Sequence, residues 1–425
     1  MPSASAGPAT GPSSRWSFLR LAGPGLVVAA TGIGSGDVVA GTVAGANYGT
    51  TLLWAIAVGA FFKFALNEGI ARWQLATGST AVEGWAEHLP RWVTWYFVVY
   101  LVLWTVAVSA ALTNATGLGI ANLTGGAISQ PWGAVLHSLV GCAFVLSGGY
   151  KGFERLMKTL VGIMGFCIVF CAALTLHDPV GALRGLLVPT VPPQGGPYVL
   201  SLIGGIGGSI TMLSYNYWMR EERLEGARHL GYVRGDIGVA YFFTAIFGMA
   251  ILLIAHQAFY VTGTRITDAQ AVPRMAEMLG SVIGPIGSWA YALGFWAAVF
   301  ASLLGVWQSV PYLYADYYGI LTHQPRAARE ALTRVTSTPY RLALAFLTLV
   351  PLPFAFLGRP IVVILTYTIV GSLFIPFLAA TLLCLNSRVA WQAPVPRNHW
   401  TTNALLIVIL LLFLVLGAQE VRTAL

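Results

Sequence analysis

Two glycine-rich stretches, Gly32-Ile33-Gly34-Ser35-Gly36-Asp37 and Gly204-Gly205-Ile206-Gly207-Gly208-Ser209, each interrupt a long apolar run of the sequence. Glycine costs about 1 kcal/mol relative to alanine inside a helix, so a cluster of glycines favours a point at which the helix unwinds. Both stretches also carry hydroxyl or carboxyl side chains at a depth where polar groups are costly. We therefore predict two broken membrane helices. The alternative is that the glycines only allow close helix packing.

The rest of the sequence predicts an all-α integral membrane protein. Hydrophobic residues make up 57% of the 425 residues and charged residues only 9%, whereas soluble domains carry about 25% charged residues. A helix needs about 20 apolar residues to cross a bilayer. Eleven stretches meet this length, at residues 22–47, 51–77, 93–120, 131–149, 152–177, 197–218, 237–262, 281–313, 340–357, 360–385 and 402–419.

The positions of the breaks predict the internal organisation. They fall in the first and sixth spans, which fits two five-helix halves related as an inverted repeat, with both broken helices meeting near the middle of the membrane. We expect repeat one at residues 22–177, repeat two at 197–385 and an extra helix at 402–419. These segments form a single transporter domain over residues 21–425. The polar, Pro- and Ser-rich residues 1–20 should be a disordered cytoplasmic N-terminus.

Basic residues predict the orientation. With the N-terminus in the cytoplasm, 17 of the 23 Lys and Arg residues lie on the inner side, as the positive-inside rule requires. We therefore expect the plasma (inner) membrane of a bacterium, with the C-terminus outside. The net charge of +8 then reflects orientation, so the expected partners are the lipid bilayer and a small ion or solute, with no nucleic acid. The charged segment 220–236 should be a solvated cytoplasmic loop.

Ionisable residues inside the first two spans are candidates for function. A charge at the bilayer centre costs about 2.5–3.5 kcal/mol on insertion scales, so such residues are usually paired or functional. Glu68 and Arg72 are four residues apart and should pair on one helix face. Lys63 has no acidic residue three or four positions away on its own helix. We hypothesise that it pairs with Asp37 beside a central cavity.

Several short motifs of the sequence resemble one transporter family. The start of the chain is similar to that of the Nramp (natural resistance-associated macrophage protein) family, and the similarity covers most of residues 20–385. The resemblance implies a leucine-transporter-like fold and transport of divalent metals, typically coupled to protons. The matching positions are Gly23-Pro24-Gly25-Leu26, Gly34 to Asp37, Tyr48-Gly49, Leu52-Leu53-Trp54, Arg72, Thr77-Gly78, Tyr150 to Met157, the sixth-span break and Ile375-Pro376-Phe377.

The sequence departs from this family at the motifs that bind metal. The family's Asp-Pro-Gly-Asn of the first span reads Gly34-Ser35-Gly36-Asp37 here, and its Met-Pro-His of the sixth span reads Met212-Leu213-Ser214. Acidic positions of the third span align with Trp104, Ala111 and Asn114. One carboxylate and one thioether remain, at Asp37 and Met212, and Mn²⁺ or Fe²⁺ tolerates a thioether better than Mg²⁺ does.

The sequence thus supports a secondary-active transporter that moves a divalent metal of the Mn/Fe/Mg class by alternating access. The metal would be a substrate, and no resident cofactor is expected. The expected substrate or ion site contains Gly34, Ser35, Asp37, Thr211, Met212 and Ser214, with Asp37 and Met212 as metal ligands and Lys63, Asn114, Tyr215 and Thr368 as pocket or coupling residues.

A second hypothesis keeps the scaffold but changes the cargo. The loss of family ligands, the glycine-rich breaks, Lys63 and the aromatic residues Tyr215, Tyr217 and Trp218 would suit a small organic or anionic solute, without metal binding or family-type proton coupling. An enzyme is not expected, because the sequence shows no paired nucleophile and base, no nucleotide-binding loop and no soluble catalytic domain.

Overall fold

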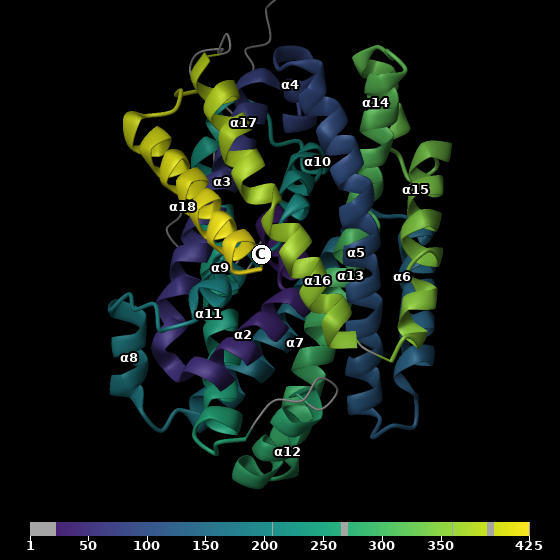
Figure 1. The fold of residues 1–425 in the computed structure, drawn as a ribbon. Helices are drawn as coiled ribbons and strands as arrows, with labels where there is room; N and C mark the ends of the chain where they lie inside the picture. Colours follow the sequence, from purple (N-terminus) through teal and green to yellow (C-terminus); the bar gives the residue numbers. More distant parts are fainter. Residues whose placement is uncertain (1–22, 206, 265–270, 359, 389–394, 425) are drawn as a thin grey trace, which may run out of the picture.

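The computed structural model describes residues 23–205, 207–264, 271–358, 360–388 and 395–424 (Figure 1). The N-terminal segment predicted to be disordered, residues 1–20, lies outside the described residues. All the regular structure in the described part is helical. Each of the eleven predicted spans is helical, and eight helical stretches are individually long and apolar enough to cross a membrane. Only the second half of the first span falls within one of these stretches, Ser35–Thr77, and the fourth and eleventh spans are helices outside that set of eight.

The first five spans begin with a broken helix, as predicted. Two half-helices, α1 and α2, form the first span, and the next four follow in chain order. Their bounds are Pro24–Gly32 for α1, Ser35–Tyr48 for α2, Leu53–Thr77 for α3, Arg91–Leu123 for α5, Gln130–Ser147 for α6 and Tyr150–Thr175 for α7.

The second five spans also begin with a broken helix. Here α9, the short 3-10 turn η3 and α10 together form the sixth span. The bounds are Gly196–Gly205 for α9, Ile210–Leu213 for η3, Ser214–Glu221 for α10, Leu230–Ala255 for α11, Pro285–Leu321 for α13, Thr338–Leu349 for α15, Pro360–Ser372 for α16 and Phe374–Arg388 for α17. The α11 helix continues into a π-helical turn at His256–Tyr260.

Short helices lie in the connections between the spans, at the two ends of the bundle. The helices α4 (Ala81–His88) and α14 (Arg326–Leu332) lie at one end, and α8 (Pro179–Leu187) and α12 (Ala271–Ile283) lie at the other (Figure 1). The α4 turn starts with a capping box, in which the Glu83 amide donates to Thr80 Oγ1 and the Thr80 amide donates to the Glu83 carboxylate. The connections that hold α4 and α14, which follow the second and the eighth predicted spans, therefore lie at the same end of the bundle.

Three boundaries differ from the sequence prediction. The eighth span runs on to Leu321 rather than ending near 313, and α11 begins at Leu230 rather than near 237. Half of the extra residues of the eighth span are buried by protein, whereas only Val233 and Asp236 are buried among residues 230–236 of α11. The tenth span is also broken, between α16 and α17 at Leu373. Pro376 accounts for this break, because a proline ring clashes with the carbonyl four residues earlier and lacks an N–H.

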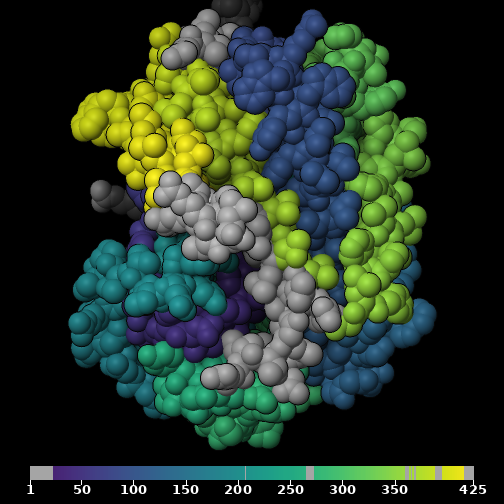
Figure 2. Space-filling view, in the orientation of Figure 1, coloured from purple at the N-terminus to yellow at the C-terminus, as the bar shows by residue number. Residues whose placement is uncertain are grey.

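The broken first span packs inside the bundle, where α1 contacts α7, α11 and α13, and α2 contacts α9, α11 and α16. The last helix, α18 (Trp400–Ala424), packs outside the ten-helix core against α3, α9 and α17. Figure 2 shows the yellow C-terminal helices on the upper left of one face, apart from the blue and green helices on the right. The predicted extra helix is thus peripheral.

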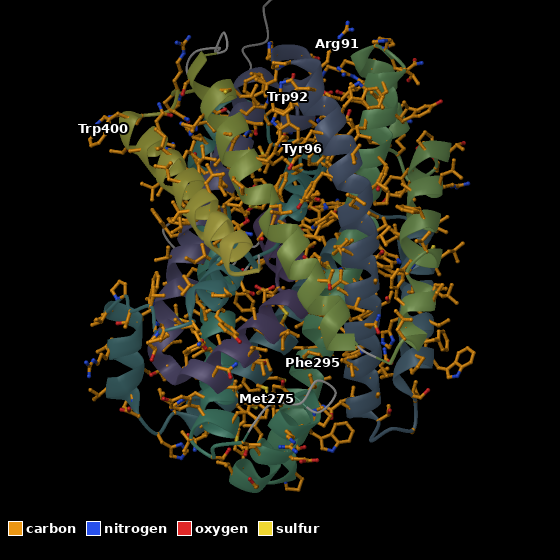
Figure 3. The ribbon with its side chains drawn as sticks, in the orientation of Figure 1. Arg91, Trp92, Tyr96, Met275, Phe295 and Trp400 are labelled. Carbon is orange, nitrogen blue, oxygen red and sulfur yellow. The ribbon has the colours of Figure 1, made fainter. Side chains whose placement is uncertain are left out.

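Aromatic side chains mark the α4 end of the bundle. Trp92, Trp95 and Tyr96 on α5 are all exposed on the protein surface. Figure 3 places Arg91, Trp92 and Tyr96 together near that end, with Met275 and Phe295 near the opposite end. Such exposed Trp and Tyr rings are typical of the membrane–water interface.

Candidate functional site

The first break consists of two residues without helical structure. Ile33 and Gly34 are extended, with φ/ψ of −78°/99° and −139°/−156°. The backbone of the sixth span approaches closely here, because a Cβ on Gly32 would lie 2.7 Å from the Gly207 carbonyl carbon and oxygen. Glycine at position 32 is therefore required for the two breaks to touch.

The sixth-span break is made by two glycines in a left-handed conformation. Gly207 and Gly208 have φ of +77° and +79°, a region that L side chains rarely adopt and that ends a right-handed helix. The half-helix α9 therefore stops at Gly205, and η3 resumes at Ile210. The carbonyls at the end of α9 and the amides of the break are left free to bind other groups.

Asp37 joins the two breaks through its carboxylate. Oδ2 accepts a hydrogen bond of 3.0 Å from the Gly34 amide, and Oδ1 accepts one of 2.9 Å from the Gly207 amide. The side chain is only 3% exposed. The predicted carboxylate thus faces the crossing of the broken spans rather than lipid, and here it is satisfied by backbone N–H groups of both.

Lys63 lies on the other side of the sixth-span break. Its ammonium group donates to the Gly204 carbonyl at 3.0 Å and to the Gly208 carbonyl, and the residue is fully buried. Among the described ion pairs, none joins Lys63 to Asp37 within 4.0 Å. The hypothesised direct pair is therefore replaced by an arrangement in which each charge binds the backbone of the break.

The crossing encloses very little space. A cavity of about 10 Å³ lies among Gly204, Gly205, Gly208, Ser209, Tyr367 and Gly371, which is room for about one water molecule. Trp104 closes one side, because its indole N–H donates to Ser209 Oγ at 2.9 Å. The described residues that line this cavity therefore leave no space for a hydrated ion or an organic solute.

The remaining predicted site residues are buried beside the breaks. Ser35, Thr211, Met212 and Ser214 are each at most 4% exposed. Thr211 faces the break, because a Cβ on Gly208 would lie 2.3 Å from its hydroxyl oxygen. The hydroxyl oxygens of Ser35 and Ser214 are buried and have no hydrogen-bond partner among the described residues. No cluster of three or more His, Cys, Asp or Glu residues occurs in the described part of the chain.

Three predicted pocket residues lie elsewhere or outside the described side chains. Asn114 bonds to the Ala110 carbonyl and to Gln130 at the start of α6, so it joins the third and fourth spans. Tyr215 donates to Asp236 on α11. Thr368 belongs to α16, but its side chain lies outside the described part of the structure.

Asp236 is an important residue that the sequence analysis missed. It was assigned to a solvated loop, yet it is 1% exposed and lies in the first two turns of α11. Its carboxylate accepts bonds from the Gly25 amide at 2.7 Å, the Gly23 amide at 3.2 Å and the Tyr215 hydroxyl at 2.9 Å. It therefore caps the N-terminus of α1, where a helix carries partial positive charge, and joins spans one, six and seven.

A second cluster of buried polar side chains lies at the α4 end of the bundle. Glu83 on α4 forms ion pairs with Arg220 at 2.8 Å and Arg329 at 3.6 Å. Asp316 on α13 accepts bonds from Tyr217 at 2.8 Å and Thr80 at 3.2 Å. This cluster connects the end of the sixth span to α4, α13 and α14.

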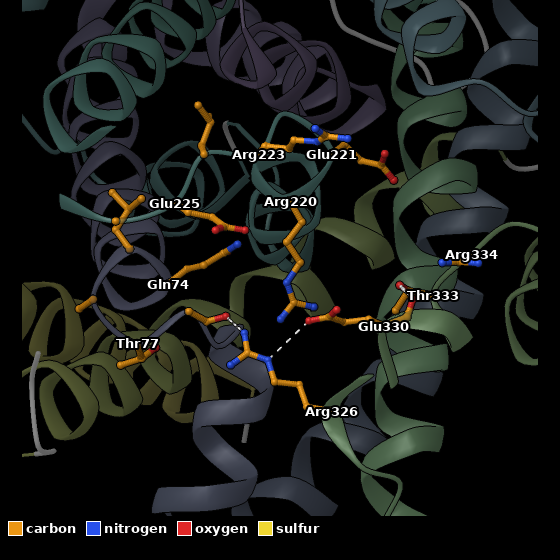
Figure 4. A pocket seen from close by; sticks show the side chains of 15 residues that line it. Gln74, Thr77, Arg220, Glu221, Arg223, Glu225, Arg326, Glu330, Thr333 and Arg334 are labelled. Carbon is orange, nitrogen blue, oxygen red and sulfur yellow. Dashed lines mark hydrogen bonds and ion pairs between the residues drawn. The ribbon is translucent and has the colours of Figure 1, made fainter. Parts of the chain in front are cut away.

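A pocket of about 740 Å³ opens beside this cluster. Figure 4 shows Arg220, Arg326 and Glu330 converging there, with Arg326 bonded to the Gly78 carbonyl and to Glu330 at 3.5 Å. The pocket is polar and lined by both signs of charge. The predicted Glu68–Arg72 pair, at 3.2 Å, is confirmed, and Arg234 joins it at 2.8 Å.

Comparison with known proteins identifies similar sequences. The profile described as "Natural resistance-associated macrophage protein-like" matches residues 25–422. The divalent metal cation transporter MntH of Chromohalobacter salexigens is 26% identical over 290 residues, which cover 65% of this chain and 65% of that protein. MntH of Klebsiella pneumoniae is 26% identical over 61% of this chain and 64% of its own length. The chain thus aligns with slightly less than two thirds of these relatives.

Solved structures share the fold. The manganese transporter of Eremococcus coleocola superposes with a TM-score of 0.72 at 15% identity, covering 97% of this chain and 88% of that one. MhsT in complex with L-phenylalanine superposes with a TM-score of 0.57 at 16% identity, covering 93% and 98%. At such identities these likenesses show the leucine-transporter-like fold alone.

Proposed function

Because the chain belongs to the Nramp family, we propose that it is a secondary-active transporter that moves a divalent metal cation of the Mn/Fe/Mg class by alternating access. The observation that carries the proposal is the Asp37 carboxylate at the contact of the two broken spans. Metal ions are substrates of the relatives named divalent metal cation transporter. An enzymatic role is not expected of a member of a transporter family.

The proposed metal ligands are few and of mixed character. Asp37 supplies an oxygen anion, Met212 a thioether, and the breaks supply carbonyl oxygens near Gly34 and Thr211. This set suits Mn²⁺ or Fe²⁺ better than Mg²⁺, which prefers oxygen ligands and retains its water. To bind the metal, Asp37 must exchange its bonds to the Gly34 and Gly207 amides for the cation. The contact between the two breaks must therefore open before the metal enters.

Hydrogen bonds divide the helices into a moving group and a scaffold. Spans one, two, six and seven are connected to one another at several places, each involving a charged or polar side chain. Among them are Asp37 to Gly207, Lys63 to Gly204, Asp236 to Gly25 and Tyr215, and Glu68 to Arg234. We propose that these four spans move as one body.

The contacts of the moving group with the remaining helices are the ones that opening must break. Ser302 on α13 donates to the Thr31 carbonyl at 2.7 Å, and Trp104 on α5 donates to Ser209. At the α4 end, Tyr217 bonds to Asp316 and Arg220 to Glu83. Breaking the second set would connect the site to the pocket of Figure 4, which we propose to be the cytoplasmic mouth.

The orientation is part of the proposal. The bias of basic residues supports a cytoplasmic N-terminus and an external C-terminus in the plasma membrane of a bacterium, which agrees with the bacterial origin of MntH relatives. The α4 and α14 connections, both predicted to be inside, lie at the same end of the bundle (Figure 1). The repeat boundaries at 22–177 and 197–385 are likewise proposed.

A second cargo is favoured by one observation. The Lys63 ammonium already places a positive charge in the sixth-span break, which opposes a dication and would attract a carboxylate. Calorimetric titration of purified protein separates the two hypotheses. Saturable heat with Mn²⁺ and none with amino or carboxylic acids supports metal transport, whereas the reverse pattern replaces it with the organic or anionic solute.

A further inference from the structure

Lys63 carries a buried positive charge that other groups of the protein must compensate. The residue is fully buried in the middle of α3, and among the described residues no carboxylate pairs with it. A buried charge without a partner is strongly unfavourable, so other groups must stabilise it. The partners present are the carbonyl oxygens of Gly204 and Gly208.

These carbonyls form a cation-binding end of a helix. Gly204 belongs to the last turn of α9, where the final carbonyls have no partner within the helix and carry partial negative charge. Gly208 adds a second carbonyl from the left-handed turn that follows. In transporters with broken helices, such half-helix ends and unwound carbonyls coordinate small monovalent cations.

Close packing of α3 on α9 brings the lysine to this position. A Cβ on Gly59, one turn before Lys63, would lie 2.9 Å from the Ile203 Cα atom. The two helices therefore touch through glycine, and the lysine stem runs along α9 to its end. The position of the ammonium is thus fixed by the backbone rather than chosen by a mobile side chain.

We propose that the sixth-span break contains a monovalent-cation site that is permanently filled by the protein's own Lys63 ammonium group. The tethered cation neutralises the carbonyl end of α9 while Asp37 neutralises the amide side of the same break, so no dissolved Na⁺ or K⁺ is needed there. This inference concerns a site other than the proposed metal ligands, and it holds whichever cargo the protein carries.

The test removes the tethered cation and supplies a free one. Lys63→Ala leaves both the carbonyls and the space, so its apparent Tm should fall by several degrees in choline chloride. Ammonium or methylammonium chloride at the same concentration should restore much of that loss. Lys63→Met fills the space with an apolar chain and should lose stability without rescue. Wild type and the exposed-lysine control Lys151→Ala should show no difference between the salts.

Each outcome decides the proposal. A Lys63→Ala protein that is stable only in ammonium salts supports a cation site. The same holds if the variant is recovered in monodisperse form only when it is extracted in those salts. A Lys63→Ala protein whose Tm is the same in choline and in ammonium overturns it, as does failure to recover the variant in either salt. Lys63→Met with wild-type stability would also overturn it, because the carbonyls would then not need a cation.

Discussion

The Gly207 amide on the sixth span donates a hydrogen bond of 2.9 Å to the Asp37 carboxylate on the first span. The two residues are 170 positions apart in the sequence, yet both lie at points where a membrane helix is broken. A hydrogen bond to a charged group contributes about 1.5–3 kcal/mol. The contact therefore stabilises the packing of the two broken spans, and under the proposed function it is exchanged when the metal binds.

The close contact between the backbones of the two breaks can be tested by adding a methyl group at Gly32. Gly32→Ala places a Cβ 2.7 Å from backbone atoms of Gly207, which cannot move aside as a side chain can. We expect a Tm several degrees lower and transport close to background. Gly162→Ala on α7 is the matched control, because nothing lies within 4 Å of its Cβ. Equal Tm and equal transport in the two variants would show that the breaks do not touch.

Asp236, which caps α1, also accepts a hydrogen bond from the Tyr215 hydroxyl, and we expect this bond to stabilise the protein. Tyr215→Phe removes the donor of the 2.9 Å bond to Asp236 and should lower the free energy of unfolding by about 1.5–3 kcal/mol. Tyr318→Phe, at an exposed position on α13, should change it by less than about 0.5 kcal/mol. Chemical denaturation of both variants measures the difference. An unchanged Tyr215→Phe protein would show that the bond from the Tyr215 hydroxyl to Asp236 does not contribute to stability.

Closure at the α4 end should depend on one buried glutamate. Glu83→Gln removes the charge that Arg220 and Arg329 share, whereas Glu87→Gln removes only an exposed carboxylate 3.4 Å from Arg329. Losing one partner of a buried ion pair is strongly destabilising, so the pathway should open more often in Glu83→Gln.

This opening can be followed by alkylation of a cysteine placed at buried Ser214. The background should be a chain whose four native cysteines are replaced. We expect faster labelling with Glu83→Gln than with Glu87→Gln. Identical rates would mean that the cluster does not gate access.

Orientation can be read from reporters fused to the chain. With the C-terminus outside, alkaline phosphatase fused after Leu425 should be active in a bacterial host, and a green fluorescent protein fused there should be dark. Truncation after residue 397, which removes α18, should exchange the two signals. The opposite pattern in both fusions would reverse the assignment of inside and outside.

The broken helices were predictable because clustered glycines are a local signal. The same holds for the Glu68–Arg72 pair, which follows from a spacing of four residues. Asp236 was missed because its bonds reach Gly23 and Gly25, 213 and 211 residues away, and the charges near it in sequence suggested a solvated loop. Long-range capping of a helix leaves no local pattern.

The partner of Lys63 was not predictable for a related reason. The sequence suggested Asp37 because a charged side chain is visible in a sequence, whereas the carbonyls of Gly204 and Gly208 belong to every residue and become ligands only where a helix ends. The break at Leu373 could have been predicted, since Pro376 is present in the sequence, but the apolar run around it suggested one continuous span.

Flux of Mn²⁺ into proteoliposomes loaded with a metal-quenched dye tests the central claim most directly. The wild-type protein should give saturable quenching, and Asp37→Asn should reduce it at least tenfold while the exposed control Asp178→Asn leaves it unchanged. Wild-type rates in a folded Asp37→Asn protein, or no Mn²⁺ flux in the wild type, would contradict a metal pathway through the contact of the two broken helices.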